Sequence, residues 1–428
     1  MTMSTQSSVT EEFLVTPEIL ACPYDYYRRV RDEAPVHQTP LGFWLVSRYD
    51  DVMSVLRDSD RFSSNFTTAF AVGAPPSPEL MEIMAEGFPP ANTLLTNDPP
   101  SHTQFRGLVN KAFSPRRVAQ LETEIRTVAN DLIDGFIGDG RVELVTQFAV
   151  GLPLTIIADA LGVDRADMAR FKQWSDHAVA PLSGLLDAQQ MLDCARSRVE
   201  MQHYMAARIE ERRTDPRDDL LTDLVGARFD SGERSGEALT VAELLNVIEQ
   251  ILVAGNETTT KLFASGIVAL IENPQQMSKV RANPELIANL VEEALRIESP
   301  VQMLPRIAKV DVDVGGVIIP AGSMLMAMYG CANRDEAKYP SGEVFDIERV
   351  NARSHLAFGQ GAHFCVGAAL ARSEARIGFE LLLHRLGDIA LAQMDHPTER
   401  ELSMTLRGMS ALHLTFTAVP TTQEPESH

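Results

Sequence analysis

The chain has 428 residues and a strongly acidic charge balance. It carries 38 Lys and Arg against 59 Asp and Glu, so its formal net charge is −21. This excess argues against a general nucleic-acid binder and against attachment to a membrane surface through a basic patch, because both need clustered cationic side chains. With 45% hydrophobic and 23% charged residues, the composition is typical of a globular protein with a large core.

The sequence shows no sign of membrane insertion or export. Its longest apolar stretches reach about half of the ~20 residues that span a bilayer, and Met1 to Glu12 lacks the apolar core of a signal peptide. We therefore expect a cytoplasmic protein that binds neither membrane nor nucleic acid. Length alone would suggest two or three domains of about 150 residues each. Since no linker-like stretch divides the chain, we predict a monomer with one domain over 1–428, extended or flexible at 1–20 and 420–428.

In chain order, the predicted elements are mostly helices. Alternating apolar residues near 35–47 predict a short strand region. The segment 66–97 is rich in Pro, Ala and Gly without a stable period, and it is predicted as a long loop, either a wall of a binding site or a surface linker. Apolar residues three and four apart predict helices, so the fold class is mainly α with small β-sheets. The helices are expected at 118–137, 152–161, 189–213 and 241–272, and two later strand regions at 308–319 and around 410–418.

The helix over 241–272 is the longest, and its apolar middle contains a polar cluster. Thr240 and Glu243 have capping-box spacing at its start, and Pro274 stops it. Polar side chains inside a buried helix cost free energy unless they are paired, and a threonine there can bond back to a carbonyl. Alone, the cluster fits either a solvated polar stripe or a kinked helix with a groove. It reads Ala254-Gly255-Asn256-Glu257-Thr258-Thr259.

A cysteine stands at the entrance of another predicted helix. Four cysteines lie far apart in the sequence, with no Cys-x-x-Cys pair, so any cysteine chemistry rests on one residue. Unpaired N–H groups and the helix dipole should lower the pKa of such a thiol. Neighbouring glycines permit positive φ and close approach to a flat group. The alternatives are a buried structural cysteine or a zinc site, although the further ligands that zinc needs are missing. The segment is Phe358-Gly359-Gln360-Gly361-Ala362-His363-Phe364-Cys365-Val366-Gly367.

The series Phe-Gly-x-Gly-x-His-x-Cys-x-Gly resembles the haem-binding loop of the cytochrome P450 family. The resemblance implies the fold of that family, a triangular-prism helical domain that encloses haem b. It also implies that the Cys365 thiolate ligates the haem iron, as in that family. Four other residues of the loop would then contact the cofactor, namely Phe358, Gly359, His363 and Gly367.

Three further motifs are similar to those of the same family. The polar cluster of the long helix is similar to the acid-alcohol pair, which implies that Ala254 and Gly255 leave room over the haem while Glu257 and Thr258 relay protons. Glu293-Ala294-Leu295-Arg296 resembles the Glu-x-x-Arg motif, with Arg349 as the third partner of a structural network. His102 and Arg106, four apart at a helix start, match propionate-binding positions together with Arg306 and His363.

The resemblance implies a haem-thiolate monooxygenase. The expected partners are dioxygen, a small hydrophobic substrate such as a terpenoid or steroid, and a ferredoxin with an NAD(P)H-dependent reductase, because the chain has no flavin or nicotinamide fingerprint. The ferredoxin would dock on a local basic face. Two alternatives remain, a hydrogen-peroxide-driven peroxygenase and a non-enzymatic haem sensor. Arg407 is a candidate for a substrate carboxylate, although a backbone contact at a turn fits it better. The residues expected on the basic face are Arg116, Arg117, Arg372 and Arg376.

Overall fold

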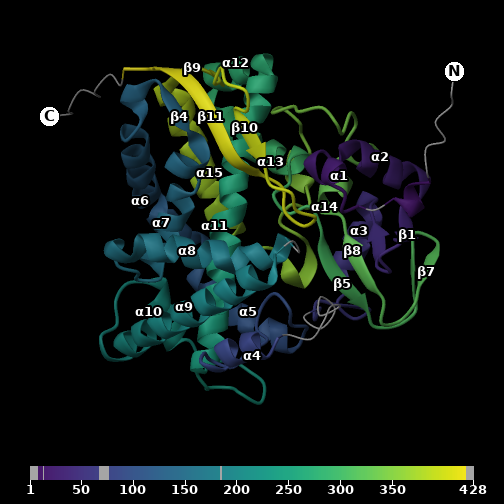
Figure 1. The fold of residues 1–428 in the computed structure, drawn as a ribbon, viewed down its shortest axis with the longest axis vertical. Helices are drawn as coiled ribbons and strands as arrows, with labels where there is room; N and C mark the ends of the chain where they lie inside the picture. The colour runs from purple at the N-terminus through teal and green to yellow at the C-terminus, as the bar shows by residue number, and fades with distance from the viewer. Residues whose placement is uncertain (1–7, 13, 67–76, 184–185, 421–428) are drawn as a thin grey trace.

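The structure is a computed structural model that describes residues 8–12, 14–66, 77–183 and 186–420. Helices surround the central helix α11 (Val241–Glu272), while two groups of short strands lie on different sides of the molecule (Figure 1). This arrangement confirms the predicted class, mainly α with small sheets. In the described part of the chain, no helix is long and apolar enough to cross a membrane.

Helix α11 has the bounds predicted from the sequence. The Thr240 hydroxyl accepts from the backbone N–H of Glu243, and the Glu243 carboxylate accepts from the N–H of Thr240 at 2.8 Å. The helix ends before Pro274, which begins the next helix. Helices that contact α11 directly include α7 (Gly151–Ala160), α8 (Met168–Val179), α9 (Ala188–Thr214), α12 (Pro274–Ala282), α13 (Ile287–Ile297) and α15 (Ala368–Arg385).

The remaining helices lie around this core. Helix α6 begins three residues before its predicted start at residue 118, a difference typical of helix ends. The α15 segment follows the cysteine loop, as expected. These outer helices are α1 (Pro17–Ala21), α2 (Tyr24–Glu33), α3 (Tyr49–Arg57), α5 (Ser101–Ala112), α6 (Pro115–Asp134), α10 (Leu220–Gly226) and α14 (Tyr329–Ala332).

The strands form three small sheets. Strands β1, β2, β6, β7 and β11 lie in the predicted regions and β5 adjoins one of them, whereas β3, β4, β8, β9 and β10 were not predicted. The five-stranded sheet has the order β1-β2-β8-β5-β3, in which only β2 and β8 are parallel. Strand β11 pairs with β4, β9 and β10, and β6 pairs with β7. The bounds are β1 (Val36–Gln38), β2 (Trp44–Val46), β3 (Phe62–Ser63), β4 (Arg141–Glu143), β5 (Leu304–Ala308), β6 (Val312–Val314), β7 (Val317–Ile319), β8 (Met324–Ala327), β9 (Leu386–Leu391), β10 (Thr398–Arg400) and β11 (Met409–Ala418).

The prediction of an unbroken loop over 66–97 is wrong. Helix α4 spans Pro78–Ala85 within it, capped by the Ser77 hydroxyl, which accepts from the N–H of Leu80. Its buried Ile83 belongs to an apolar cluster with Leu192 and Ala195 of α9. Contact with a distant helix therefore stabilises a segment whose local composition favours a loop. Residues 67–76 of the predicted loop lie outside the described residues.

Candidate active site

The cysteine loop folds tightly before α15. The backbone N–H of Cys365 donates to the Phe358 carbonyl at 2.8 Å. Gly359 and Gly361 have φ of +65° and +70°, as the glycine pattern predicts. A Cβ on Gly361 would lie 2.4 Å from the backbone oxygen of Leu56, so the loop closes directly on α3. Gly367 differs from the prediction, because its φ is −81° and it serves as the N-cap of α15.

The thiol of Cys365 differs from the prediction in the direction of its pKa shift. Burial raises the pKa of the free thiol, while backbone N–H groups of Gly367 and Ala368 act to lower it. The helix start therefore points its N–H groups at the sulfur as expected, but loss of water outweighs them. The sulfur is pre-positioned, and a cation would be needed to stabilise its thiolate form.

A buried ion-pair network holds the loop from behind, and sequence reasoning missed it. The Arg372 guanidinium lies 4.5 Å from the centre of the Phe358 ring and pairs with Glu292 at 2.6 Å. His355 Nε2 lies 3.0 Å from the other oxygen of Glu292. Burial acts to raise the pKa of Glu292, but hydrogen bonds from His355 and Arg372 outweigh it and bring the pKa to about 2. In the sequence, the two adjacent acids Glu292 and Glu293 were the feature that could have indicated this network.

Basic side chains gather on one side of this loop. The rings of His102 and His363 lie 4.0 Å apart between centroids. Both are held neutral: burial, with a contribution from Arg106, lowers the pKa of His102 to about 4, and burial together with His102 and Arg306 lowers that of His363 to about 3. The Asp98 carboxylate acts in the opposite direction but does not outweigh burial. We call His102, Arg106, Arg306 and His363 the basic cluster.

The basic cluster fits a planar cofactor that carries carboxylates. His363 Nε2 is buried and has no hydrogen-bond partner in the described part of the chain. Arg306 is 5% exposed, donates to the carbonyl of Pro305 at 2.7 Å and also lies within hydrogen-bonding reach of the Tyr329 hydroxyl. Arg106 donates from Nε to Asn110 Oδ1 at 2.8 Å, which leaves its terminal nitrogens for another acceptor. Buried donors of this kind need anionic partners, and two propionates would supply them.

The middle of α11 presents an open face. Ala254 is exposed although most of the residues around it are buried, and Thr258, one turn later, is partly exposed. The Thr258 hydroxyl donates to the Ala254 carbonyl at 2.9 Å, the backward bond expected of a helical threonine. Gly255 does not share this face, because a Cβ there would lie 3.2 Å from Ile157 of α7. Its small size therefore serves helix packing and not room above a cofactor.

The carboxylate of Glu257, which the resemblance assigns to the proton relay, contacts a buried lysine. It accepts a hydrogen bond from Lys261 Nζ at 2.5 Å, and the same ammonium lies 2.6 Å from Glu401. Lys261 is 1% exposed. Because Glu401 lies 140 positions away in the sequence, no local pattern predicted the contact.

A second buried acid lies beside the same helix. Glu374 of α15 is 1% exposed, and its Oε1 atom has no hydrogen-bond partner in the described residues. Burial raises the pKa of Glu374 to about 8, and the Thr259 hydroxyl only partly offsets this rise. At neutral pH the side chain is therefore largely protonated. The polar cluster of α11 thus contains one ion-paired acid, Glu257, and contacts one neutral acid, Glu374, through Thr259.

Comparisons with known proteins bear on this arrangement. The family model described as Cytochrome P450 matches residues 178–408. The cytochrome P450 monooxygenase PikC of Streptomyces venezuelae is 36% identical over 402 residues, which cover 92% of this chain and 91% of that protein. This chain belongs to the cytochrome P450 family.

Solved cytochrome P450 structures share the whole fold. CYP109Q5 from Chondromyces apiculatus matches with a TM-score of 0.84 and 38% identity, over 96% of this chain and 99% of that one. CYP109E1 from Bacillus megaterium, solved with testosterone, matches with a TM-score of 0.78 and 33% identity, over 92% of this chain and 99% of that one. Cytochrome P450s are haem-thiolate monooxygenases, so the predicted family, fold, enzyme class and haem b cofactor are confirmed.

The Glu-x-x-Arg residues of this cytochrome P450 form a fully buried network. Arg296 pairs with Glu293 through two hydrogen bonds of 2.7 Å, and both side chains are 0% exposed. Arg349 Nε lies 3.2 Å from the same carboxylate. Arg296 also donates to the carbonyls of Asn333 and Gly342, so the network ties α13 to the segment before the cysteine loop.

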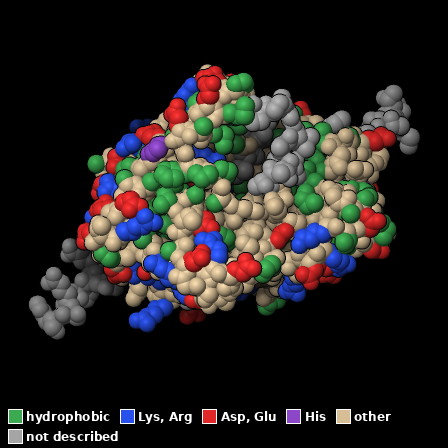
Figure 2. Space-filling view, turned by 90° about the horizontal axis from the view of Figure 1, so that it is seen from below, with side chains coloured by type: hydrophobic (Ala, Val, Ile, Leu, Met, Phe, Trp, Pro, Cys, Tyr) green, Lys and Arg blue, Asp and Glu red, His purple; other side chains and the backbone are tan. Residues whose placement is uncertain are grey.

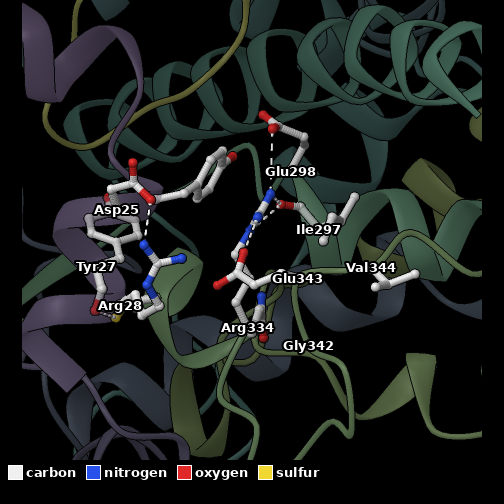
Figure 3. Close-up of polar contacts among 12 residues, drawn as sticks. Asp25, Tyr27, Arg28, Ile297, Glu298, Arg334, Gly342, Glu343 and Val344 are labelled. Carbon is white, nitrogen blue, oxygen red and sulfur yellow. Dashed lines mark hydrogen bonds and ion pairs between the residues drawn. The ribbon is translucent and has the colours of Figure 1, made fainter. Parts of the chain in front are cut away.

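Arg407 of the P450 chain lies in a different polar cluster. Its Nε is 2.9 Å from Glu298, and Nη1 donates to the carbonyl of Ala21 at 3.1 Å. The backbone contact agrees with the prediction, but the principal partner is a carboxylate that the sequence did not indicate. Figure 3 shows the neighbouring Arg334 between Glu298 and Glu343. Arg407 is therefore already paired and does not await a substrate carboxylate.

The zinc alternative lacks its further ligands. Among the described residues, no group of three or more His, Cys, Asp or Glu side chains is placed to hold a metal ion through protein ligands alone. A site in which the protein gives a single thiolate and a macrocycle gives the other ligands needs no such group. The loop around Cys365 offers a single thiol of this kind.

Proposed function

We propose that this cytochrome P450 inserts one oxygen atom of dioxygen into a small hydrophobic substrate, a terpenoid, a steroid or a similar molecule, with electrons from a ferredoxin and its NAD(P)H-dependent reductase. The observation that carries the proposal is the basic cluster beside the cysteine loop, with the unpaired Nε2 of His363 at its centre. If this cluster binds the two carboxylates of haem b, the iron can lie within reach of the Cys365 sulfur.

In this proposal Cys365 ligates the iron, and Phe358, Gly359 and Gly367 shape the loop around its sulfur. His102, Arg106, Arg306 and His363 bind the two propionates. When bound, the haem-thiolate group supplies dioxygen activation, because an axial thiolate donates electron density that favours O–O cleavage. Glu293, Arg296 and Arg349 act at a distance, by fixing the segment that leads to the cysteine.

On the other face, Ala254 leaves space for the oxygen molecule and Thr258 positions it together with a water. Reduction of one oxygen atom to water consumes two protons, and an alcohol next to a carboxylate can hold the water that passes them on. Thr258 would hold this water, and Glu257 would supply its protons. Glu257 is suited to this because its ion pair with Lys261 keeps it in one orientation.

The substrate class rests on two observations. On the face drawn in Figure 2, hydrophobic side chains border a hollow. CYP109E1, 33% identical to this chain, has been solved with testosterone, a steroid. Since Arg407 is paired with Glu298, the proposal is for an uncharged, hydrocarbon-rich substrate. A compound library screened for the low-to-high-spin shift of the Soret band would identify it.

The ferredoxin part of the proposal does not rest on the predicted basic face. Arg117 pairs with Asp218 at 2.9 Å, Arg372 with Glu292 at 2.6 Å, and Arg376 with Glu122 at 2.7 Å. Of the four arginines, Arg116 alone makes no ion pair with described residues. Charge reversal of Arg116 should raise the apparent KM for ferredoxin. Unchanged kinetics would show that Arg116 does not take part in docking.

The ferrous-CO spectrum tests the cofactor assignment, and coupled turnover tests the activity. Wild type should show the thiolate-type Soret band, Cys365→His should lose it, and Cys22→Ser should keep it because Cys22 is exposed. Product formation with NADH, ferredoxin and reductase should fall strongly in Thr258→Ala with haem retained. Turnover with hydrogen peroxide but not with reduced ferredoxin would instead favour a peroxygenase, and haem binding without turnover would favour a sensor.

A further inference from the structure

Lys261 is a buried cation that joins two carboxylates of different exposure. Its ammonium lies 2.5 Å from Glu257 and 2.6 Å from Glu401. The side chain of Lys261 is 1% exposed, that of Glu257 is 18% exposed and that of Glu401 is 34% exposed. Glu257 lies one turn earlier on α11, and Glu401 directly follows β10. The three groups therefore connect the interior of α11 to the protein surface.

The fold makes room for this lysine. A Cβ on Gly408 would lie 2.3 Å from Lys261 Cγ, so only glycine fits against the lysine stem. The N–H of Glu401 donates to the Gly408 carbonyl at 3.3 Å, which holds the turn that brings Glu401 over the ammonium. A buried ion pair is often no more stable than well-packed apolar side chains of the same size. Packing alone therefore gives no reason for a charged residue at this position.

The polar stripe continues along α11 to a cavity. Ser265, one turn after Lys261, is buried, and its hydroxyl has no hydrogen-bond partner in the described part of the chain. It lines a cavity of about 330 Å³ together with Arg400, which precedes Glu401. Glu298, Arg334 and Glu343, drawn in Figure 3, form another wall. A water needs only about 10–15 Å³ of such space and two or more polar partners, so the cavity can hold several waters.

We propose that Glu401, Lys261 and Glu257 form the route by which solvent protons reach the acid-alcohol pair. The inference rests on the proposed monooxygenase function, whose balance is RH + O₂ + 2 e⁻ + 2 H⁺ → ROH + H₂O. For each proton delivered, Glu257 passes its proton to the water held by Thr258. Lys261 then gives a proton to Glu257 and regains one from Glu401. Glu401 takes its replacement proton from solvent water. The charge of the three groups is then restored. Lys261 also acts as a positioning residue, because it fixes the orientation of Glu257.

Glu401→Gln tests the outer step, and Glu399→Gln is its control. Glu399 is an exposed carboxylate on β10, two residues away. We expect Glu401→Gln to lower turnover with dioxygen and ferredoxin by about tenfold or more and to raise the solvent deuterium isotope effect. Turnover driven by hydrogen peroxide should stay within about twofold of wild type, because peroxide brings its own protons and electrons. Glu399→Gln should change neither assay.

A loss of equal size in both assays would show that Glu401 is structural, and wild-type values in both would remove it from the route. Failure of the proposed function looks different, because wild type itself would then give no product with dioxygen and ferredoxin. The two ideas are therefore separable in one set of measurements.

Variants of Lys261 test the same inference without haem. In the haem-free protein, Lys261→Met should lower the thermal midpoint by about 3 °C or more, because it leaves two carboxylates without their buried partner. The triple variant with Glu257→Gln and Glu401→Gln should regain most of this loss. In the holoenzyme, Lys261→Arg should keep more dioxygen-driven turnover than Lys261→Met, while both keep peroxide-driven turnover. An unchanged midpoint together with wild-type turnover in Lys261→Met would overturn the proposal.

Discussion

The imidazole rings of His102 and His363 lie 4.0 Å apart at an interplanar angle of 35°. One comes from the start of α5 and the other from the cysteine loop, and both rings are neutral because burial and the nearby arginines lower their pKa values. Two neutral rings in contact can each direct an N–H donor to the same anion. Their position beside Cys365 makes them the best-defined part of the proposed propionate site.

Removing either ring should weaken haem retention. We expect His363→Ala and His102→Ala each to speed haem dissociation by about tenfold to a hundredfold, since a hydrogen bond to a charged group contributes about 1.5–3 kcal/mol. Transfer of haem to excess apomyoglobin measures the rate. His396→Ala, at an exposed position, is the control and should behave as wild type. Haem dissociation at the wild-type rate in both variants would show that the propionates bind elsewhere.

Gly361 should not tolerate even one added methyl group. Its φ is +70°, and a Cβ would lie 2.4 Å from the Leu56 carbonyl oxygen. Gly316 also has positive φ, +85°, but a Cβ there would meet nothing within 4 Å. Gly316→Ala should therefore cost only the backbone term of about 1–2 kcal/mol. Gly361→Ala should cost about 1–3 kcal/mol more through overpacking. Urea unfolding measures both values, and equal costs would contradict the predicted clash.

The sequence predicted those elements whose ends are marked by capping residues, proline or glycine within the element itself. Helix α11 has its predicted ends because a capping box and a proline mark them. Helix α4 was missed because its stability comes from Ile83 against α9, a contact that no local pattern carries. The pKa shift of Cys365 was predicted in the wrong direction because the helix dipole can be inferred from sequence, whereas the depth of burial cannot.

In the candidate site too, contacts within one motif were predicted and contacts between distant segments were not. Residues within one motif, such as Glu293 and Arg296, were paired correctly because their helical spacing brings them together. Lys261 meets Glu401 only through the tertiary fold, so this contact was not predicted. Gly255 was expected to face the cofactor because the motif resembles the Ala-Gly pair of the family. A Cβ there would instead meet Ile157 of α7, since neighbouring residues in a helix point in different directions.

The network of Glu293 should respond much more strongly to mutation than surface ion pairs do. Arg296→Ala leaves the buried Glu293 carboxylate with Arg349 as its cation and the backbone N–H of Asp346 as a further donor. Because the principal cation is lost, we expect a loss of about 3–5 kcal/mol in the free energy of unfolding. The control is Arg213→Ala, which removes an exposed pair with Glu210 and should cost less than about 1 kcal/mol. Urea unfolding compares the two. Similar small losses in both variants would mean that water or neighbouring carbonyls compensate for the missing guanidinium.

Glu374 should make stability fall as the pH rises. Burial raises its pKa to about 8 from the ordinary value of 4.5, so between these pH values the native state binds more protons than the unfolded state. The free energy of unfolding must then decrease with pH in this window. Its contribution is fully present below pH 4.5 and is lost as the pH passes 8, because charging a buried carboxylate without a cation is costly.

Glu374→Gln removes this titration while keeping the shape of the side chain. Relative to wild type, the variant should gain up to about 4 kcal/mol in unfolding free energy between pH 5 and pH 8, at 1.36 kcal/mol per unit of pKa difference. Urea unfolding of the haem-free protein at several pH values measures the gain. Thr259→Val removes the hydroxyl that lowers the pKa of Glu374, so its stability should continue to fall above pH 8. A difference between Glu374→Gln and wild type that does not change with pH would show that water reaches the carboxylate and keeps its pKa near the ordinary value.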